Sequence, residues 1–112
     1  HTSQLNKTAG FLLLKNARVR WFLSLDYNDL PDENIAAGKR TFRSLVIEGE
    51  EVEFSDGFTD LHTQSYRHIL DGDGFTVTDT LPSIQIAHTI RNSNISGLNG
   101  DYHPYLKDRD YL

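Results

Sequence analysis

The stretch GFTDLHTQSYRHILDGDGFTVTDTLPSIQIAHTIRNS, residues 57–93, decides the fold because it predicts two consecutive helices. Thr59 or Asp60 is suited to cap the first helix, which the DGDG turn of residues 71–74 then ends. The second helix begins around Pro82, since proline in the first helical turn loses no hydrogen bond. Two helices without an intervening strand do not form a βαβ alternation.

Each predicted helix carries apolar residues at helical spacing, which is typical of a helix that buries one side. In the first helix these residues are Phe58, Leu61, Ile69 and Leu70. In the second they are Ile84, Ile86, Ala87 and Ile90. One side of each helix is therefore expected to pack against a sheet.

Four strands are predicted before the helices. Gly10–Lys15 is a short apolar run, and Ala17–Leu25 alternates between apolar and polar residues with the period of two of a half-buried strand. Arg40–Glu48 pairs with a strand around Val52 across a tight turn at Gly49, which makes a hairpin.

The order of these elements predicts an α+β fold, with a mostly antiparallel open sheet and two helices packed on one face. Residues 1–93 are expected to form this domain and residues 94–112 an extended C-terminal tail. Residues 26–39, dense in Asp, Asn, Pro and Gly, are expected to form a long loop. The chain contains no GxGxxG sequence, so a dinucleotide-binding Rossmann domain is absent from it.

The composition limits the classes of function. The chain has 112 residues, a net charge of −5, no cysteine and no methionine. An acidic chain is a poor non-specific binder of nucleic acid, and no apolar run approaches the roughly 18 residues of a membrane span. The lack of cysteine fits a cytoplasmic protein. Because it starts at His1, the chain is expected to be a piece of a longer protein.

Two groups of polar residues are candidate ligand contacts. Asp60, His62, Tyr66 and His68 lie on the first helix, where they either bind a sugar or act as a cap and surface residues. Arg18, Arg20, Arg40 and Arg43 lie on strands. Their guanidinium groups either bind a carboxylate or pyrophosphate, or pair with nearby glutamates. Trp21 is expected to be a core residue.

No metal site is expected. His62 and His68 are six positions apart, whereas a helical zinc site needs histidines three or four apart, and no Glu-x-x-His sequence occurs. The DGDG turn lacks the glutamate that a calcium loop requires, since Pro82 occupies that position.

Two segments resemble the C-terminal part of the Gfo/Idh/MocA family of NAD(P)-dependent sugar oxidoreductases. They are AGFLLLKNARVRWFLSLDYNDLP (9–31) and AAGKRTFRSLVIEGEEVEFSDGFTDLHTQSYRHIL (36–70). The RWFLS (20–24) and GFTDLH (57–62) sequences are similar to one subgroup in particular. That subgroup comprises bacterial NAD-dependent dehydrogenases that oxidise UDP-N-acetylglucosaminuronate (UDP-GlcNAcA) at C3 for lipopolysaccharide and other surface polysaccharides.

The resemblance implies that the chain is the substrate-binding and assembly part of a two-domain enzyme. The family's catalytic Glu-Lys-Pro sequence is absent here, so we expect no catalytic residue, no bound NAD and no activity from this chain alone. The residues expected to bind the UDP-sugar are Thr59, Asp60, His62, Arg40 and Arg43. A homo-oligomer formed through the sheet is also expected. The alternative is a non-catalytic oligomerisation or sugar-binding module.

Overall fold

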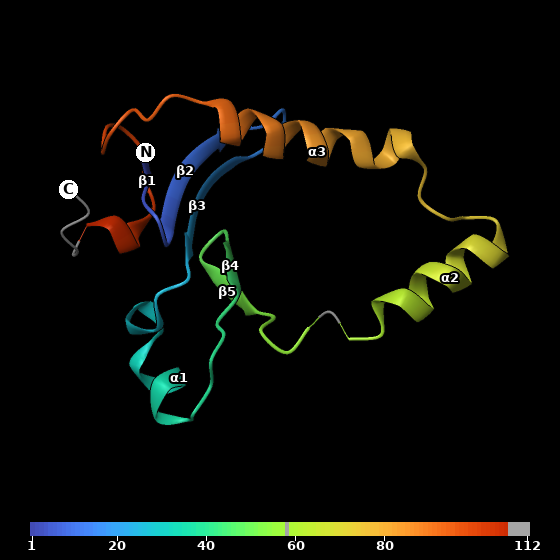
Figure 1. Cartoon of the computed structure of the whole chain (residues 1–112), viewed down its shortest axis with the longest axis horizontal. Coiled ribbons are helices and arrows are strands. Elements are labelled where there is room, and N and C mark those ends of the chain that lie inside the picture. The colour runs from blue at the N-terminus through green and yellow to red at the C-terminus, as the bar shows by residue number, and fades with distance from the viewer. Residues whose placement is uncertain (58, 108–112) are drawn as a thin grey trace. The chain divides into compact units, whose positions relative to one another are not determined.

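The computed structural model describes residues 1–57 and 59–107. In chain order its elements are β1 (Thr2–Ser3), β2 (Lys7–Leu13), β3 (Arg18–Ser24), η1 (Tyr27–Asp29), α1 (Asp32–Ala36), β4 (Ser44–Ile47), β5 (Glu50–Glu53), α2 (Leu61–Asp71), α3 (Val77–Asn92) and η2 (Pro104–Leu106), as Figure 1 shows. The predicted α+β class is confirmed, and all strand pairs are antiparallel. The described strands form two small sheets rather than the one sheet predicted.

The chain divides into two compact units. The first contains His1–Phe42 together with the C-terminal segment that begins at Asn94, and the second contains Arg43–Ser93. This division differs from the predicted one, in which residues 1–93 formed one domain.

The first unit is built on a three-stranded sheet in the order β1-β2-β3. The hairpin of β2 and β3 is the one predicted, with Leu14 N–H donating to the Ala17 carbonyl at 2.9 Å. Gly10 lies opposite Trp21 in the register. A Cβ atom at Gly10 would lie 2.6 Å from the Trp21 ring, so the indole lies directly against the glycine backbone. The predicted strands missed β1, which is only two residues long.

The C-terminal segment supplies half of the core of the first unit. Leu106 is 1% exposed and packs with Ala9, which is 2% exposed. Phe22, Leu98 and Tyr102 are partly buried around them. The extended tail predicted for residues 94–112 is therefore wrong over its described part, residues 94–107, which returns to the sheet.

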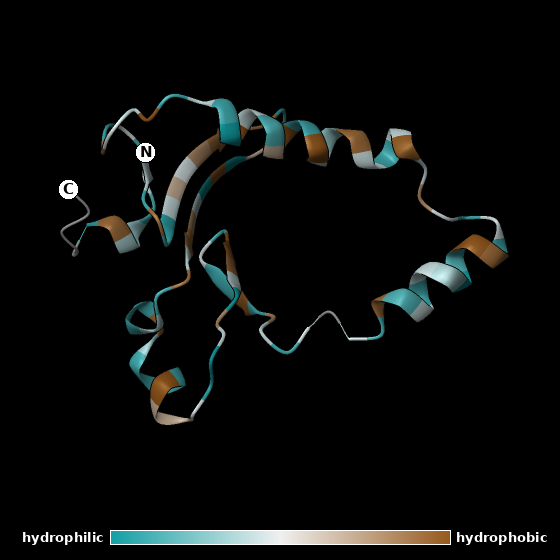
Figure 2. Ribbon diagram, in the orientation of Figure 1, coloured by the Kyte–Doolittle hydropathy of each residue, from teal (hydrophilic) through white to brown (hydrophobic). Residues whose placement is uncertain are grey.

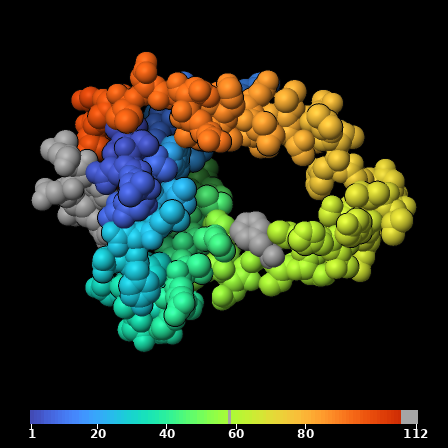
Figure 3. All heavy atoms as spheres, in the orientation of Figure 1, coloured from blue at the N-terminus to red at the C-terminus, as the bar shows by residue number. Residues whose placement is uncertain are grey.

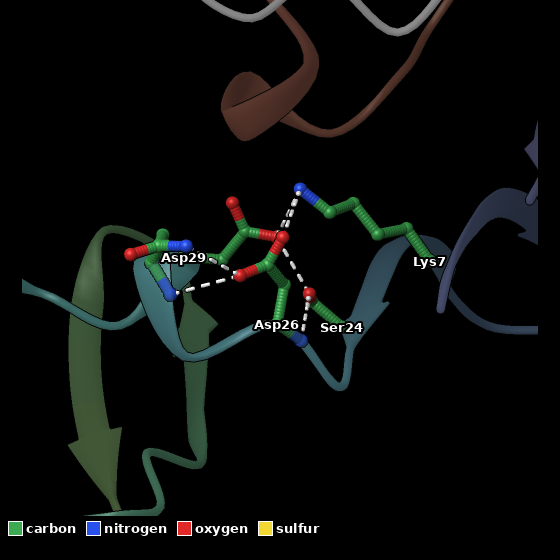
Figure 4. A network of polar contacts seen from close by, with 5 residues as sticks. Lys7, Ser24, Asp26 and Asp29 are labelled. Atoms are coloured by element: carbon green, nitrogen blue, oxygen red, sulfur yellow. Dashed lines mark hydrogen bonds and ion pairs between the residues drawn. The ribbon is translucent and has the colours of Figure 1, made fainter. Parts of the chain in front are cut away.

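The predicted loop at residues 26–39 contains two short helices, η1 and α1, and is anchored where it leaves β3 (Figure 4). Lys7 Nζ lies 2.9 Å from Asp29 Oδ2 and 3.2 Å from Asp26 Oδ2. Ser24 Oγ donates to Asp29 Oδ2 at 2.5 Å. Asp26 caps η1 by accepting from Asn28 N–H at 3.0 Å. This backbone hydrogen bond, with Lys7, lowers the pKa of Asp26 below its ordinary value of 3.8. Together these contacts fix the start of the loop to the ends of β2 and β3.

The second unit begins with the β4–β5 hairpin, which confirms the predicted tight turn. Ser44 pairs with Glu53 and Ile47 with Glu50. Glu48 and Gly49 both have positive φ angles, 52° and 90°, as the two central residues of a two-residue hairpin turn with the favoured twist do. The first strand begins at Ser44 and not at Arg40 as predicted.

Helices α2 and α3 were both predicted, but α3 begins earlier than expected. Thr76 and Asp79 form a reciprocal capping box, so the helix starts at Val77 and Pro82 lies inside it. That cap satisfies backbone N–H groups at the helix start, which a proline alone cannot do. Gly72 ends α2 with a φ of 83°.

Neither α2 nor α3 contains a buried residue among those described. Leu61 is 53% exposed, Ile69 60% and Ile84 64%. Figure 2 shows hydrophobic turns in brown along both helices. Phe58, predicted to belong to the apolar side of the first helix, lies outside the described residues. No helix within the described ranges is long and apolar enough to cross a membrane.

Candidate functional site

Arg43 and the segment that leads into α2 are joined by hydrogen bonds just beyond the β4–β5 hairpin. Phe54 N–H donates to the Arg43 carbonyl at 2.9 Å. The backbone N–H of Arg43 donates to Ser55 Oγ at 2.9 Å, and Arg43 Nη1 donates to the Ser55 carbonyl at 3.3 Å. These bonds join Arg43 to Ser55, which lies four residues before Thr59 in the chain. Sequence reasoning missed Ser55, whose one signal was a small polar residue directly before a turn.

Asp60 has an unusual backbone conformation. Its φ and ψ angles are 60° and 23°, the left-handed helical region, which costs an ordinary residue about 1–2 kcal/mol. Aspartate and asparagine tolerate this region better than most side chains do. The Asp60 carbonyl accepts from Gln64 N–H at 3.0 Å, so the backbone of Asp60 begins α2.

The Asp60 carboxylate, one of the two caps predicted, does not cap the helix. The left-handed backbone explains the difference, because a side-chain cap normally requires an extended N-cap residue. Within residues 1–57 and 59–107, no hydrogen bond or ion pair engages the Asp60 side chain. The carboxylate is exposed and remains available to a ligand.

Thr59 and His62 flank Asp60 and are also exposed. Thr59, Asp60 and His62 are near neighbours in the chain, and Arg43 belongs to the same unit. Arg40 belongs to the first unit, where it is exposed and lies outside any strand. Figure 3 shows the atoms of α2, the helix that contains His62.

The other candidate residues have different partners. His68 Nδ1 lies 3.1 Å from Asp73 Oδ2, beyond the end of α2, and its ring contacts Phe75. Arg20 forms an ion pair with Asp101 of the C-terminal segment at 3.3 Å. The partner in this ion pair is an aspartate, and not one of the nearby glutamates that the alternative prediction named.

Two further observations limit what the described residues can bind. Among them, no three His, Asp or Glu side chains are grouped closely enough to hold a metal ion. A hollow of about 360 Å³ at the tip of the β4–β5 hairpin is lined by Ile47, Glu48, Glu50 and Val52. Its two carboxylates would repel a pyrophosphate or a uronate, so this hollow does not suit a UDP-sugar acid.

The chain is similar to a dehydrogenase of known structure. No family model matches the chain. The structure is similar to that of the WlbA (WbpB) dehydrogenase from Thermus thermophilus in complex with NAD and α-ketoglutarate, with 44% identity and a TM-score of 0.87. It is also similar to that dehydrogenase in complex with NAD and UDP-GlcNAcA, with 42% identity and a TM-score of 0.86. Each match covers 94% of this chain and 34% of the dehydrogenase.

The resemblance inferred from the sequence is thus confirmed: the similar structures are those of an NAD-bound dehydrogenase, seen in one case with UDP-GlcNAcA. The chain spans about a third of the length of that enzyme.

Proposed function

We propose that this chain is the substrate-holding, C-terminal part of an NAD-dependent dehydrogenase of the Gfo/Idh/MocA family that oxidises C3 of UDP-GlcNAcA. The observation that carries the proposal is the identity of 44% over 94% of the chain with a dehydrogenase solved with NAD. A second structure of that enzyme contains UDP-GlcNAcA. We place the parent enzyme in the bacterial cytoplasm, where its product would supply surface polysaccharides, including lipopolysaccharide.

In this proposal NAD accepts the hydride and is bound by a part of the protein outside this chain. The chain itself lacks the glycine-rich fingerprint that a dinucleotide-binding turn needs. Its role is to bind and orient the sugar nucleotide, which places the reacting carbon at the cofactor.

We assign substrate contacts to Thr59, Asp60, His62, Arg40 and Arg43. The hydroxyl and carboxylate groups of Thr59 and Asp60 suit sugar hydroxyls, and guanidinium groups suit a pyrophosphate or a uronate. Support comes from the exposed positions of Thr59, Asp60 and His62 at the start of α2. In the chain these residues follow Ser55, which is hydrogen-bonded to Arg43.

Asp60→Asn tests this assignment in the full-length enzyme. Asparagine also tolerates the left-handed backbone, so the variant removes the charge and keeps the helix start. Because hydrogen bonds to charged groups contribute about 1.5–3 kcal/mol, we expect KM for UDP-GlcNAcA to rise by roughly tenfold or more. Initial rates of NADH formation at varied UDP-GlcNAcA measure this change.

The matched control is Asp56→Asn, which changes an exposed aspartate four residues earlier and should leave KM unaltered. Equal KM values for the two variants would remove Asp60 from the site. Failure of the wild-type full-length protein to reduce NAD with UDP-GlcNAcA would refute the function itself. The 112-residue chain alone should form no NADH.

Assembly through a sheet is the second function that we propose. Three consecutive residues of β4 are exposed, namely Leu45 at 52%, Val46 at 66% and Ile47 at 60%. Apolar side chains on both faces of a strand favour burial against another polypeptide. A second copy of the protein would provide such a surface, and the parent enzyme is then a homo-oligomer.

A further inference from the structure

The C-terminal segment at residues 94–107, here called the strap, contacts the rest of the first unit at several points. Leu106 supplies the buried side chain, and Asp101 pairs with Arg20 of β3. The ring nitrogens of His1 lie 2.8 Å from the Gly97 carbonyl and 3.0 Å from the Asp101 carbonyl. Each contact joins residues about eighty or more positions apart, so nothing local replaces it if the strap detaches.

His103 is the N-cap residue of η2 in the strap. Its Nδ1 atom accepts a hydrogen bond from Tyr105 N–H at 3.3 Å, which makes it the side-chain cap of η2. The Leu106 N–H then donates to the His103 carbonyl at 3.0 Å. An imidazole whose Nδ1 accepts a hydrogen bond must be unprotonated at that atom. The cap before the buried Leu106 therefore requires neutral His103.

The surroundings of His103 are apolar or positively charged. Its ring stacks on Phe22 with centroids 5.9 Å apart, and it meets the edge of Tyr105 at 5.2 Å. Arg20 of β3 faces it, and the Asp101 carboxylate that would offset a positive charge is already bonded to Arg20. Tyr105 and Lys107 are titratable groups of the strap itself, and His1, at the β1 side, points its ring nitrogens at strap carbonyls.

We propose that the strap is an acid-sensitive latch, in which protonation of His103 abolishes the η2 cap and withdraws Leu106 from the core of the first unit. The proton would go to Nδ1, which then donates and can no longer accept from Tyr105. The imidazolium would also repel the Arg20 guanidinium. Release of the strap exposes Ala9 and Phe22 on the sheet.

The direction of the pH effect follows from burial of the His103 ring and from Arg20, which both lower the pKa of His103 below its ordinary value of 6.5. The detached strap exposes the imidazole, whose pKa then returns to about 6.5. The closed strap therefore has its full stability above about pH 6.5 and loses it as the pH falls through the lowered pKa.

Hydrogen exchange of peptides from residues 98–107, followed by mass spectrometry on the whole chain and corrected for intrinsic rates, tests the latch. We expect exchange of these amides to rise roughly threefold or more between pH 7.5 and pH 5, because the protonated ring can no longer cap η2. Exchange in β2 and β3 away from the strap should change less.

His103→Asn is the decisive variant, because asparagine caps helices well and does not titrate. Its strap exchange should be independent of pH, whereas the control His88→Asn, on the exposed surface of α3, should keep the wild-type dependence. The latch is refuted if wild-type strap exchange does not change with pH. It is equally refuted if His103→Asn retains the full pH dependence.

Discussion

Leu106→Ala is expected to destabilise the first unit by about 2–5 kcal/mol, the usual cost of truncating a buried leucine. Leu106 is 1% exposed and is one of two buried apolar residues among those described. Ala9, the buried residue packed against Leu106, is too small to fill the cavity. Urea denaturation followed by fluorescence of Trp21, the one tryptophan of the chain, reports on this unit.

Leu5→Ala is the matched control, since Leu5 is 103% exposed and its truncation removes no buried contact. We expect that variant to unfold within about 0.5 kcal/mol of the wild type. If the two leucine variants unfold at the same urea concentration, the strap does not belong to the core in solution.

Lys7→Met is expected to cost about 3 kcal/mol at pH 7, because it removes one partner of a buried ion pair. The Asp29 side chain is 5% exposed and lies 2.9 Å from the Lys7 amine, with Asp26 on the same amine at 3.2 Å. Lys7→Met takes away the amine that lies between these two carboxylates. Thermal denaturation at pH 7 and pH 4 measures the effect.

The pH dependence of that loss identifies its cause. Protonation of a carboxylate relieves the repulsion, so the deficit of Lys7→Met relative to wild type should shrink at pH 4. In the wild type the lowered pKa of Asp26 contributes stability that is present above about pH 3.8 and is lost below it, so this contribution is retained at pH 4. Lys15→Met, at an exposed turn, is the control and should have little effect at either pH. If the loss of stability in Lys7→Met is the same at both pH values, Lys7 stabilises the loop by packing and not by its charge.

Local patterns were sufficient for the hairpins and for the two long helices. The alternation of residues 17–25 and the turn at Gly49 predicted paired strands, and both pairs exist. The start of α3 was misplaced because the Thr76–Asp79 capping box was overlooked in favour of Pro82. Thr59 or Asp60 is the cap of α2 that the sequence predicts, but the left-handed backbone of Asp60 prevents its side chain from capping.

The candidate site was predicted only in part. Thr59, Asp60 and His62 came from one contiguous motif, and their nearness needs no tertiary structure. The bonds between Arg43 and Ser55 join residues twelve positions apart across the β4–β5 hairpin, and only the folded hairpin brings them together. No pattern in the sequence distinguishes Ser55 from other small polar residues before a turn.

The sequence by itself determined the antiparallel hairpins, the two helices and the resemblance to a sugar-nucleotide dehydrogenase, because periodicity, turn residues and motifs act between near neighbours. The tertiary structure decided that residues 94–107 belong to the core and that Lys7 anchors the loop after β3. Leu106 meets Ala9 across almost the whole chain, and Lys7 meets Asp29 only once β2 and β3 have paired. Contacts at such separations leave no periodic signal in the sequence, so only the folded chain defines them.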